Sequence, residues 1–196
     1  MPDILKKLAE LIGFLPGIGE KTAVKLAFFL LKSHPSYLKK LSETLAELQD
    51  TVHECATCGS LTDKQHVECE ICRNPLRKTE VLCVVEDYLD LVSIERLGVH
   101  HGRYHVLGGV ISPISGTSPS DLHLKQLFQR IESEEIDELI LALNPNIEGE
   151  ATALYIDEYN PKKGLKISRL SKGLPNAGFI EYADEITLLS AFRGRK

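Results

Sequence analysis

Four of the five cysteines form two closely spaced pairs in the pattern C-x2-C-x10-C-x2-C, and these are Cys55, Cys58, Cys69 and Cys72. Such pairs offer four thiolates to one tetrahedral Zn²⁺ ion, and a complete sulfur shell leaves no position for a substrate water. Buried thiols without a metal would need two C-x-x-C pairs to arise by chance. His53 and His66 flank the pairs, but four cysteines make them unnecessary as ligands. We therefore predict one structural zinc ion per chain.

A second candidate site is the stretch LPGIGEKTAVKLAFFL, in which Gly17 and Gly19 separate two segments of helical periodicity. Glycines permit a tight turn, and the N–H groups that open the second helix can then bind a phosphate without reading a base. Lys21 and Lys25 are one helical turn apart, so both can reach a nucleic-acid backbone. An ordinary helical hairpin with solvated lysines is the alternative. We favour a helix-hairpin-helix that binds DNA.

A third candidate site combines the end of VVE with the loop NPNIEGEA, which bring together Glu86, Asn144 and Glu148. Carboxylates that follow neighbouring strands can hold Mg²⁺ for phosphoryl transfer, because hard cations prefer anionic oxygens. Asn144 and Asn146 offer only neutral amide oxygens, so a dedicated two-metal centre is not indicated. A weak or partner-completed cation site, with Asp87 or Glu150 as a further ligand, and a solvated acidic loop remain as alternatives.

No set of residues typical of nucleophilic catalysis accompanies these sites. His100, His101 and His105 lie close together in the sequence, but no serine or cysteine stands at a strand-to-helix turn to pair with them. The phosphate-binding pattern GxxxxGK[ST] does not occur, so nucleotide hydrolysis is not supported.

The elements that must position these residues are of two kinds. Apolar residues at helical spacing predict helices near 4–12, 24–31 and 36–48, the last with a buried stripe of Leu38, Leu41, Leu45 and Leu48. From Glu80 onward, predicted strands at 81–86, 104–109, 138–143 and 165–170 alternate with predicted helices at 87–97, 121–133 and 149–159. This alternation predicts a parallel sheet with helices on both faces, whose ligands collect beyond the carboxyl ends of the strands.

The chain is therefore expected to be a multidomain α/β protein. Its expected parts are a helix-hairpin-helix domain at 1–52, a four-cysteine zinc finger at 53–78, a parallel-sheet α/β domain at 79–172 and a C-terminal loop and helix for association at 173–196.

Composition narrows the class of protein. The 196 residues include 43% hydrophobic residues, and no apolar run reaches the length of a membrane span, so we expect a cytoplasmic protein without membrane contact. The net charge of −5 is not typical of a uniformly basic nucleic-acid binder. The charge is uneven, however, because residues 1–40 carry seven lysines and three acidic residues, a local net charge of +4.

The order of these motifs resembles that of the RecR family of bacterial recombination mediators over nearly the whole chain. The matching strings are the hairpin, the four-cysteine finger, VVE…NPNIEGEATA, GRYHVLGGVISP and EYADEITL. The resemblance implies a Toprim domain, the fold shared by topoisomerases and primases, in which a glutamate and two aspartates hold Mg²⁺. Glu86 takes the place of that glutamate, and Asn144 and Asn146 take the places of the aspartates. The loop between the cysteine pairs is longer here than is usual in the family.

The resemblance also implies a function without catalysis. The expected protein is a subunit of a ring-shaped clamp, a homotetramer built from dimers, that binds single-stranded, double-stranded or gapped DNA without sequence specificity. With RecO and RecF it would help to load the recombinase, in the cytoplasm and near the nucleoid. Lys21 and Lys25, with Gly17 and Gly19, match the DNA-contacting hairpin, the four cysteines match the zinc ligands, and the acidic loop matches the surface that engages RecO.

Two other functions compete with this hypothesis. An Mg²⁺-dependent Toprim nuclease or topoisomerase-like enzyme would use Glu86 and Glu148, and Mg²⁺ would then be a second cofactor. A zinc module for protein contact would not need Lys21 to bind DNA.

Overall fold

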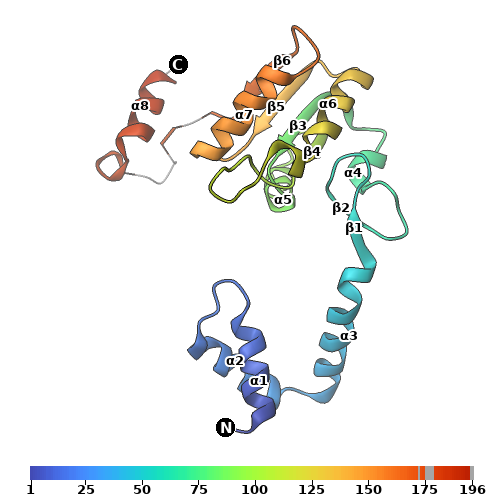
Figure 1. The fold of residues 1–196 in the computed structure, drawn as a ribbon, viewed down its shortest axis with the longest axis vertical. Helices are drawn as coiled ribbons and strands as arrows, with labels where there is room; N and C mark the ends of the chain where they lie inside the picture. Colours follow the sequence, from blue (N-terminus) through green and yellow to red (C-terminus); the bar gives the residue numbers. More distant parts are fainter. Residues whose placement is uncertain (172, 175–178, 195–196) are drawn as a thin grey trace. The chain divides into compact units, whose positions relative to one another are not determined.

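The structure is a computed structural model, and it describes residues 1–171, 173–174 and 179–194 (Figure 1). The chain divides into two compact units, residues 1–51 and residues 52–196. We call them the helical unit and the α/β unit.

The helical unit consists of three helices, α1 (Asp3–Gly13), α2 (Glu20–Lys32) and α3 (Pro35–Thr51). Its core is small and joins α1 to α2 through Leu5, Ala9 and Ala27, with Leu8, Ile12 and Val24 packed at the edge. Alanines on α2 keep the two helices close, which fixes the short turn between them. The prediction of a helix-hairpin-helix is confirmed.

The buried stripe predicted for α3 is wrong. No residue of α3 is buried, and Leu45 and Leu48 are 62% and 54% exposed. The leucines do recur at helical spacing, so the helix itself follows from the sequence. Leu38 and Leu41 are only half-buried, because α1 and α2 bury their stripes mainly against each other.

The α/β unit begins with the finger, a small lobe built around the four cysteines. Two short antiparallel strands, β1 (Val52–Glu54) and β2 (Leu61–Asp63), precede the one-turn helix α4 (Glu70–Arg73). Strands of three residues are too short to leave a periodic pattern, which is why the sequence did not predict this hairpin.

The sheet of the α/β unit has four parallel strands in the order β4-β3-β5-β6, with bounds Gly102–Val106, Lys78–Val85, Glu138–Ala142 and Lys166–Arg169. Val85 pairs with both Val106 and Ala142, so the carboxyl ends of the three strands meet. The predicted parallel sheet is confirmed, and Glu86 and Asn144 follow two adjacent strands.

Helices cover both faces of this sheet (Figure 1). On one face, α6 (Leu124–Ser133) and α7 (Ile147–Tyr159) enclose a core that includes Leu82, Val84 and Leu139. On the other face, α5 (Tyr88–Glu95) packs on Cys83 and Val85. Burial raises the pKa of the Cys83 thiol to about 12, so this cysteine remains a protonated core residue at neutral pH.

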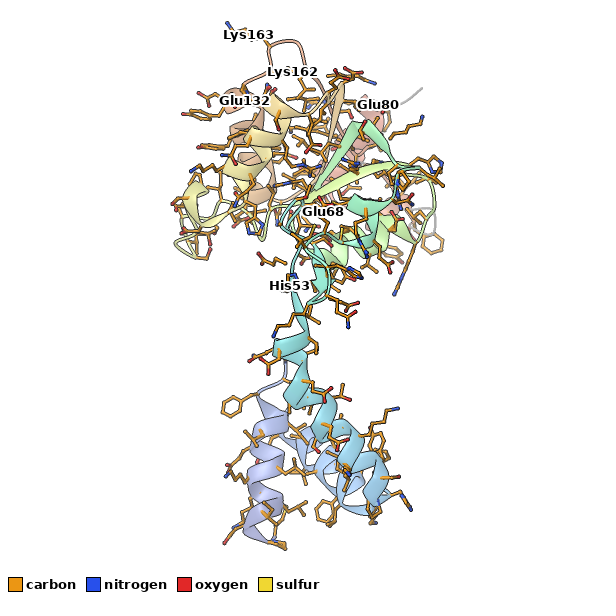
Figure 2. All side chains as sticks on the ribbon, turned by 90° about the vertical axis from the view of Figure 1, so that its right-hand side faces the viewer. His53, Glu68, Glu80, Glu132, Lys162 and Lys163 are labelled. Atoms are coloured by element: carbon orange, nitrogen blue, oxygen red, sulfur yellow. The ribbon has the colours of Figure 1, made fainter. Side chains whose placement is uncertain are left out.

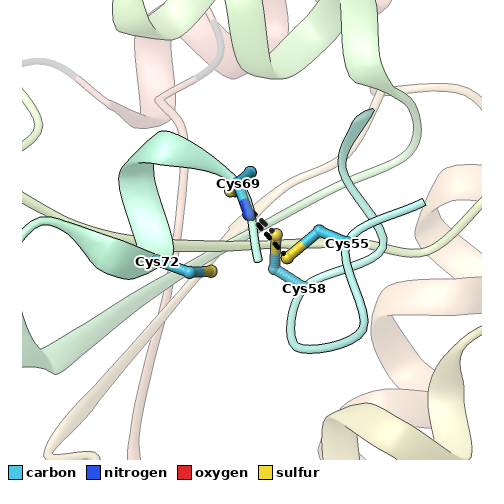
Figure 3. Close-up of side chains that lie close together, drawn as sticks. All are labelled: Cys55, Cys58, Cys69 and Cys72. Atoms are coloured by element: carbon cyan, nitrogen blue, oxygen red, sulfur yellow. Dashed lines mark hydrogen bonds between the residues drawn. The ribbon is translucent and has the colours of Figure 1, made fainter. Parts of the chain in front are cut away.

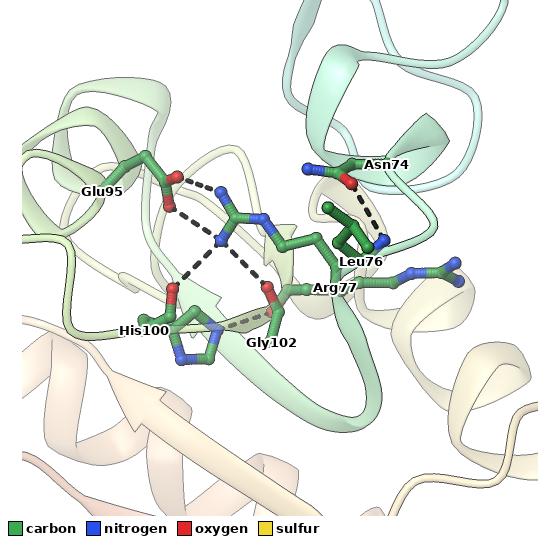
Figure 4. A network of polar contacts seen from close by, with 7 residues as sticks. Asn74, Leu76, Arg77, Glu95, His100 and Gly102 are labelled. Atoms are coloured by element: carbon green, nitrogen blue, oxygen red, sulfur yellow. Dashed lines mark hydrogen bonds and ion pairs between the residues drawn. The ribbon is translucent and has the colours of Figure 1, made fainter.

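Arg77 ties the exit of the finger to the far end of α5 (Figure 4). Its guanidinium donates to both carboxylate oxygens of Glu95 and to the carbonyl oxygens of His100 and Gly102. Burial alone would raise the pKa of Glu95, but the hydrogen bonds and charge of Arg77 lower it. The pair fixes where β3 starts relative to α5.

The C-terminal segment contains the short 3-10 helix η2 (Ile180–Tyr182) and the helix α8 (Glu185–Arg193), as expected for a terminal helix. A second 3-10 helix, η1 (Pro119–Asp121), lies before α6. Residues 175–178 of the predicted C-terminal loop lie outside the described residues. Among the helices that the structure describes, none is long and apolar enough to cross a membrane.

Candidate metal centre, hairpin and strand-end site

The four cysteine sulfurs form one compact group (Figure 3). All of them lie within 4.8 Å of one another, and the four residues are between 1% and 6% exposed. Cys58 Sγ and Cys69 Sγ are 3.6 Å apart, close to the roughly 3.8 Å expected between two sulfurs that share a tetrahedral zinc ion. The Cys69 N–H also donates to Cys55 Sγ at 3.2 Å, which ties the second cysteine pair to the first.

Electrostatics make this group a cation site. The hydrogen bonds of Cys58 to Cys69 and Cys72, together with burial, raise the pKa of Cys58. Without a cation, the negative charges of neighbouring thiolates would repel one another. The hydrogen bond from Cys58 lowers the pKa of Cys69 to about 2, so one thiolate forms first. A dication at the centre would stabilise the remaining thiolates. Four buried, converging sulfurs therefore suit a structural Zn²⁺ ion, as the spacing predicted.

The flanking histidines do not join the sulfur group. Among the described residues, the sulfur group contains the four cysteines and no histidine. His53 lies on β1, the strand that enters the finger (Figure 2). Glu68 instead supports the loop between the pairs, since its Oε1 accepts from Thr57 Oγ1 at 2.5 Å. The longer loop is therefore tied at Glu68 to the first cysteine pair.

The finger docks on the edge strand β4 through contacts that the sequence did not predict. The Val106 N–H donates to the Cys58 carbonyl at 2.7 Å, and His123 Nδ1 donates to the Val106 carbonyl at 2.9 Å. Gly59, with φ +72°, lies so close that an added Cβ would be 2.7 Å from the Val106 carbonyl oxygen. The only available signal was the glycine directly after the second cysteine, which does not reveal its neighbour.

A network of buried, hydrogen-bonded polar groups supports this docking contact. Arg130, 6% exposed, donates to the Tyr104 carbonyl at 2.9 Å and to both oxygens of Glu134. His105 Nε2 lies 2.9 Å from the His123 carbonyl, which can only accept, so Nε2 carries the proton and Nδ1 faces Arg130. Burial lowers the pKa of His105 to about 3, and it is neutral at physiological pH. His100 Nε2 lies 3.1 Å from the Arg103 carbonyl oxygen, so His100 and His105 have different partners.

The hairpin of the helical unit opens α2 without a side-chain cap. Gly19 is the N-cap residue and makes no side-chain hydrogen bond, while Gly17 adopts φ +78° in the turn before it. The first N–H groups of an α-helix have no partner within the helix and carry its positive end. Lys21 and Lys25 are both exposed on α2, so the turn presents N–H groups and two cations together.

The strand-end site brings Glu86 and Asn144 into direct contact. The Asn144 N–H donates to Glu86 Oε1 at 2.5 Å, and Asn144 Nδ2 donates to Glu86 Oε2 at 2.8 Å. Both carboxylate oxygens of Glu86 are therefore engaged by one residue. Gly149 permits this arrangement, since an added Cβ would be 2.1 Å from the Asn144 carbonyl oxygen.

The other candidate ligands of this site have separate tasks. Asn146 caps α7, because its Oδ1 accepts from the Gly149 N–H at 2.7 Å. Asp87 caps α5 through the N–H groups of its first turn, and Glu150 pairs with Arg169 at 2.7 Å. Glu148, in the first turn of α7, is half-buried. The fold brings Glu86 and the loop together as predicted, but most of their polar atoms are already used.

Known proteins resemble the chain over both units. Residues 5–48 match the family model described as "RecR, helix-hairpin-helix", and residues 80–171 match the model described as "Toprim domain". The "Recombination protein RecR" of Acidothermus cellulolyticus is 46% identical over 193 residues, which cover 98% of this chain and 96% of that protein. The protein of the same name from Myxococcus xanthus is 45% identical over 195 residues, covering 100% and 98%.

Proposed function

We propose, from the premise that the chain belongs to the RecR family of recombination proteins, that it acts in DNA repair and recombination as a non-catalytic, DNA-binding clamp subunit. The observation that carries the proposal is the uncapped hairpin at α2 beside Lys21 and Lys25. Backbone N–H groups and lysines contact phosphates, which carry no sequence information. Binding to single-stranded, double-stranded and gapped DNA without sequence preference follows.

The composition of the strand-end site supports a function without catalysis. A Toprim nuclease or topoisomerase-like enzyme would need free carboxylate oxygens to hold Mg²⁺. Here Glu86 is engaged by Asn144, and Asn146 and Asp87 cap helices. The enzyme remains the second candidate function because Glu148 stands beside this site.

Self-association into a ring, a homotetramer built from dimers, has support in each unit. The helical unit buries few side chains and leaves many large apolar ones exposed, including Phe14, Phe29, Leu31, Leu45 and Leu48. A unit of about 50 residues rarely folds stably on so small a core, so a second copy would complete it. The C-terminal segment offers a second contact, since Phe179, Ile186 and Phe192 are at least 68% exposed. Two different self-contacts allow a ring to close.

Encirclement of DNA also suits the net charge. A ring needs basic residues only on its inner surface, so an overall charge of −5 does not oppose binding. We propose that the helical unit binds DNA, that the α/β unit presents Glu86, Asn144 and Glu148 to RecO, and that RecF joins them to load the recombinase. The chain would work in the cytoplasm near the nucleoid, with zinc as the metal of the four cysteines. The boundaries 1–52, 53–78, 79–172 and 173–196 are the functional division that we propose.

The test is binding to gapped DNA at two salt concentrations, in the presence of Mg²⁺, with the oligomer sized and the DNA checked for cuts. The Lys21→Glu/Lys25→Glu variant should bind far more weakly, and its slope of log K against log salt should fall by about one for each phosphate that it no longer neutralises. Lys32→Glu/Lys40→Glu is the matched control, with the same charge change in the same unit.

The outcomes separate the three functions. Salt-sensitive binding that only the hairpin variant lacks, with intact DNA, supports the clamp. Cut DNA, with cutting abolished by Glu86→Gln, would support the Mg²⁺-dependent enzyme. Equal binding by the native chain and the hairpin variant would overturn the role of the hairpin and would favour the third function, a zinc module for protein contact.

A further inference from the structure

Glu86 joins the carboxyl ends of three adjacent strands. Its carboxylate accepts twice from Asn144, which follows β5, and its carbonyl accepts from the N–H groups of Gly108 and Gly109 at 2.9 and 3.0 Å. The two glycines follow β4.

The residue type at position 144 decides the chemistry of this junction. An ionised carboxylate only accepts hydrogen bonds, so it requires donors or a cation around it. Asn144 supplies two donors, one from the backbone and one from the side chain. An aspartate at the same place would set a second acceptor 2.8 Å from Glu86 Oε2, and two carboxylates so close need a cation or a proton between them.

We propose that Asn144 is a positioning residue whose amide replaces a cation, so that Glu86 and the loop between β5 and α7 are held in place without metal. We name this pair the amide clasp. Each Glu86 oxygen already accepts one hydrogen bond from Asn144, so Mg²⁺ has to compete with Asn144 for this carboxylate. The proposal concerns the α/β unit and goes beyond the proposed DNA binding by the helical unit. Absence of DNA binding would not affect the proposed role of Asn144.

The test compares thermal melting of full-length variants with zinc bound, in chelator-free buffer with and without Mg²⁺ or Mn²⁺. The native chain should melt at the same temperature in each buffer. Asn144→Asp should melt several degrees lower without the cation and recover with it. Manganese bound to Asn144→Asp should also be detected by electron paramagnetic resonance. The native chain should bind manganese at least tenfold more weakly, roughly the factor by which one like-charged neighbour changes the ionisation equilibrium of a carboxylate.

Three further variants distinguish the clasp from a general need for this side chain. Asn144→Ala should be destabilised and should not respond to the cation, because it lacks both the side-chain donor and the charge of an aspartate. Asn146→Asp should behave as the native chain, because an aspartate caps a helix as well as an asparagine does. Glu86→Gln/Asn144→Asp exchanges amide and carboxylate, so it should regain native melting without a cation.

Two results would overturn the proposal. One is a native melting temperature that rises with Mg²⁺ and no longer rises in Glu86→Gln, since Glu86 would then hold the cation itself. The other is native-like melting of Asn144→Asp without a cation. DNA binding by the same samples is recorded separately, so failure of the clasp and failure of the proposed function are distinguishable.

Discussion

Gly17 and Gly19 stand two residues apart in the hairpin turn, yet they have different reasons to be glycine. Gly17 has φ +78°, a conformation that costs other residues about 1 kcal/mol or more. Gly19 has φ −80°, and an added Cβ at Gly19 would have no neighbour within 4 Å. Nothing within the described chain requires a glycine at position 19, which is consistent with the approach of an outside molecule.

We therefore expect the two alanine variants to differ. Gly17→Ala should lower the free energy of unfolding by about 1 kcal/mol. Gly19→Ala should lower it by less than about 1 kcal/mol, because neither glycine nor alanine caps the helix with its side chain. Both should weaken DNA binding, Gly19→Ala through contact alone. Chemical denaturation and DNA titration measure the two effects. If Gly19→Ala binds DNA as the native chain does, close approach at this residue is excluded.

Burial of His105 makes stability depend on pH. The pKa of His105 is lowered from 6.5 to about 3. Between these two pH values the unfolded chain binds a proton at His105 and the folded chain does not. Stability from this residue is complete above pH 6.5 and is lost as the pH falls toward 3. The slope should approach 1.4 kcal/mol per pH unit, roughly that of one proton.

His105→Gln provides the matched variant, because glutamine can donate to His123 and accept from Arg130 without titrating. The free energy of unfolding is measured for both proteins at several pH values with zinc in excess. Protonation of the cysteines affects both proteins, so the difference between their slopes isolates His105. Parallel slopes would show that His105 does not titrate on unfolding.

At the scale of elements, the finger and the edge strand β4 should unfold together. The Cys58 carbonyl, Val106 and His123 are joined by hydrogen bonds, and Gly59 leaves no room for a side chain. We expect Gly59→Ala to cost at least about 2 kcal/mol, the sum of backbone strain and the clash with Val106. Thermal melting followed by zinc release and by circular dichroism should give a single, lowered transition.

Gly98 supplies the control for this variant. It has φ +63°, and an added Cβ there would have no neighbour within 4 Å, so Gly98→Ala carries the strain without the clash. It should cost about 1 kcal/mol. Equal destabilisation by Gly59→Ala and Gly98→Ala would mean that the docking contact contributes no stability.

The elements with clear periodicity were predictable, and their partners were not. Alternating strands and helices gave the parallel sheet, and two C-x-x-C pairs gave the sulfur group. The leucines of α3 gave a helix but not its exposure, because spacing does not reveal whether a face meets its own unit or another molecule. The contacts of His123 with Val106 and of Arg130 with Tyr104 carried no local signal, since these partners are 17 or more residues away in sequence.

The strand-end site illustrates the same limit. The sequence placed Glu86 beside the loop and identified asparagines where carboxylates would hold a cation. It did not reveal that the Asn144 amide donates to Glu86 or that Asn146 caps α7. Donor and acceptor pairing depends on side-chain direction, which a spacing pattern does not contain.

At the scale of the whole molecule, the exposed leucines of α3 should control assembly. Leu45→Gln/Leu48→Gln removes apolar area that is already more than half exposed, so it should change the folding of a single chain little. It should lower the oligomer size if this face contacts a second copy. Light scattering across a concentration series measures this. Leu154→Gln, at a leucine 60% exposed on α7, is the control, and an unchanged oligomer in both variants would exclude α3 from the interface.

The most direct test of the clamp compares retention on circular and linear gapped DNA of the same sequence. The protein is loaded on gapped circles, washed with high salt, and the circles are then opened at one site by a restriction enzyme. We predict that the protein stays on intact circles, leaves after linearisation, and produces no cuts of its own. Equal retention on circles and linear DNA would contradict encirclement, and strand breaks before the restriction step would contradict a non-catalytic role.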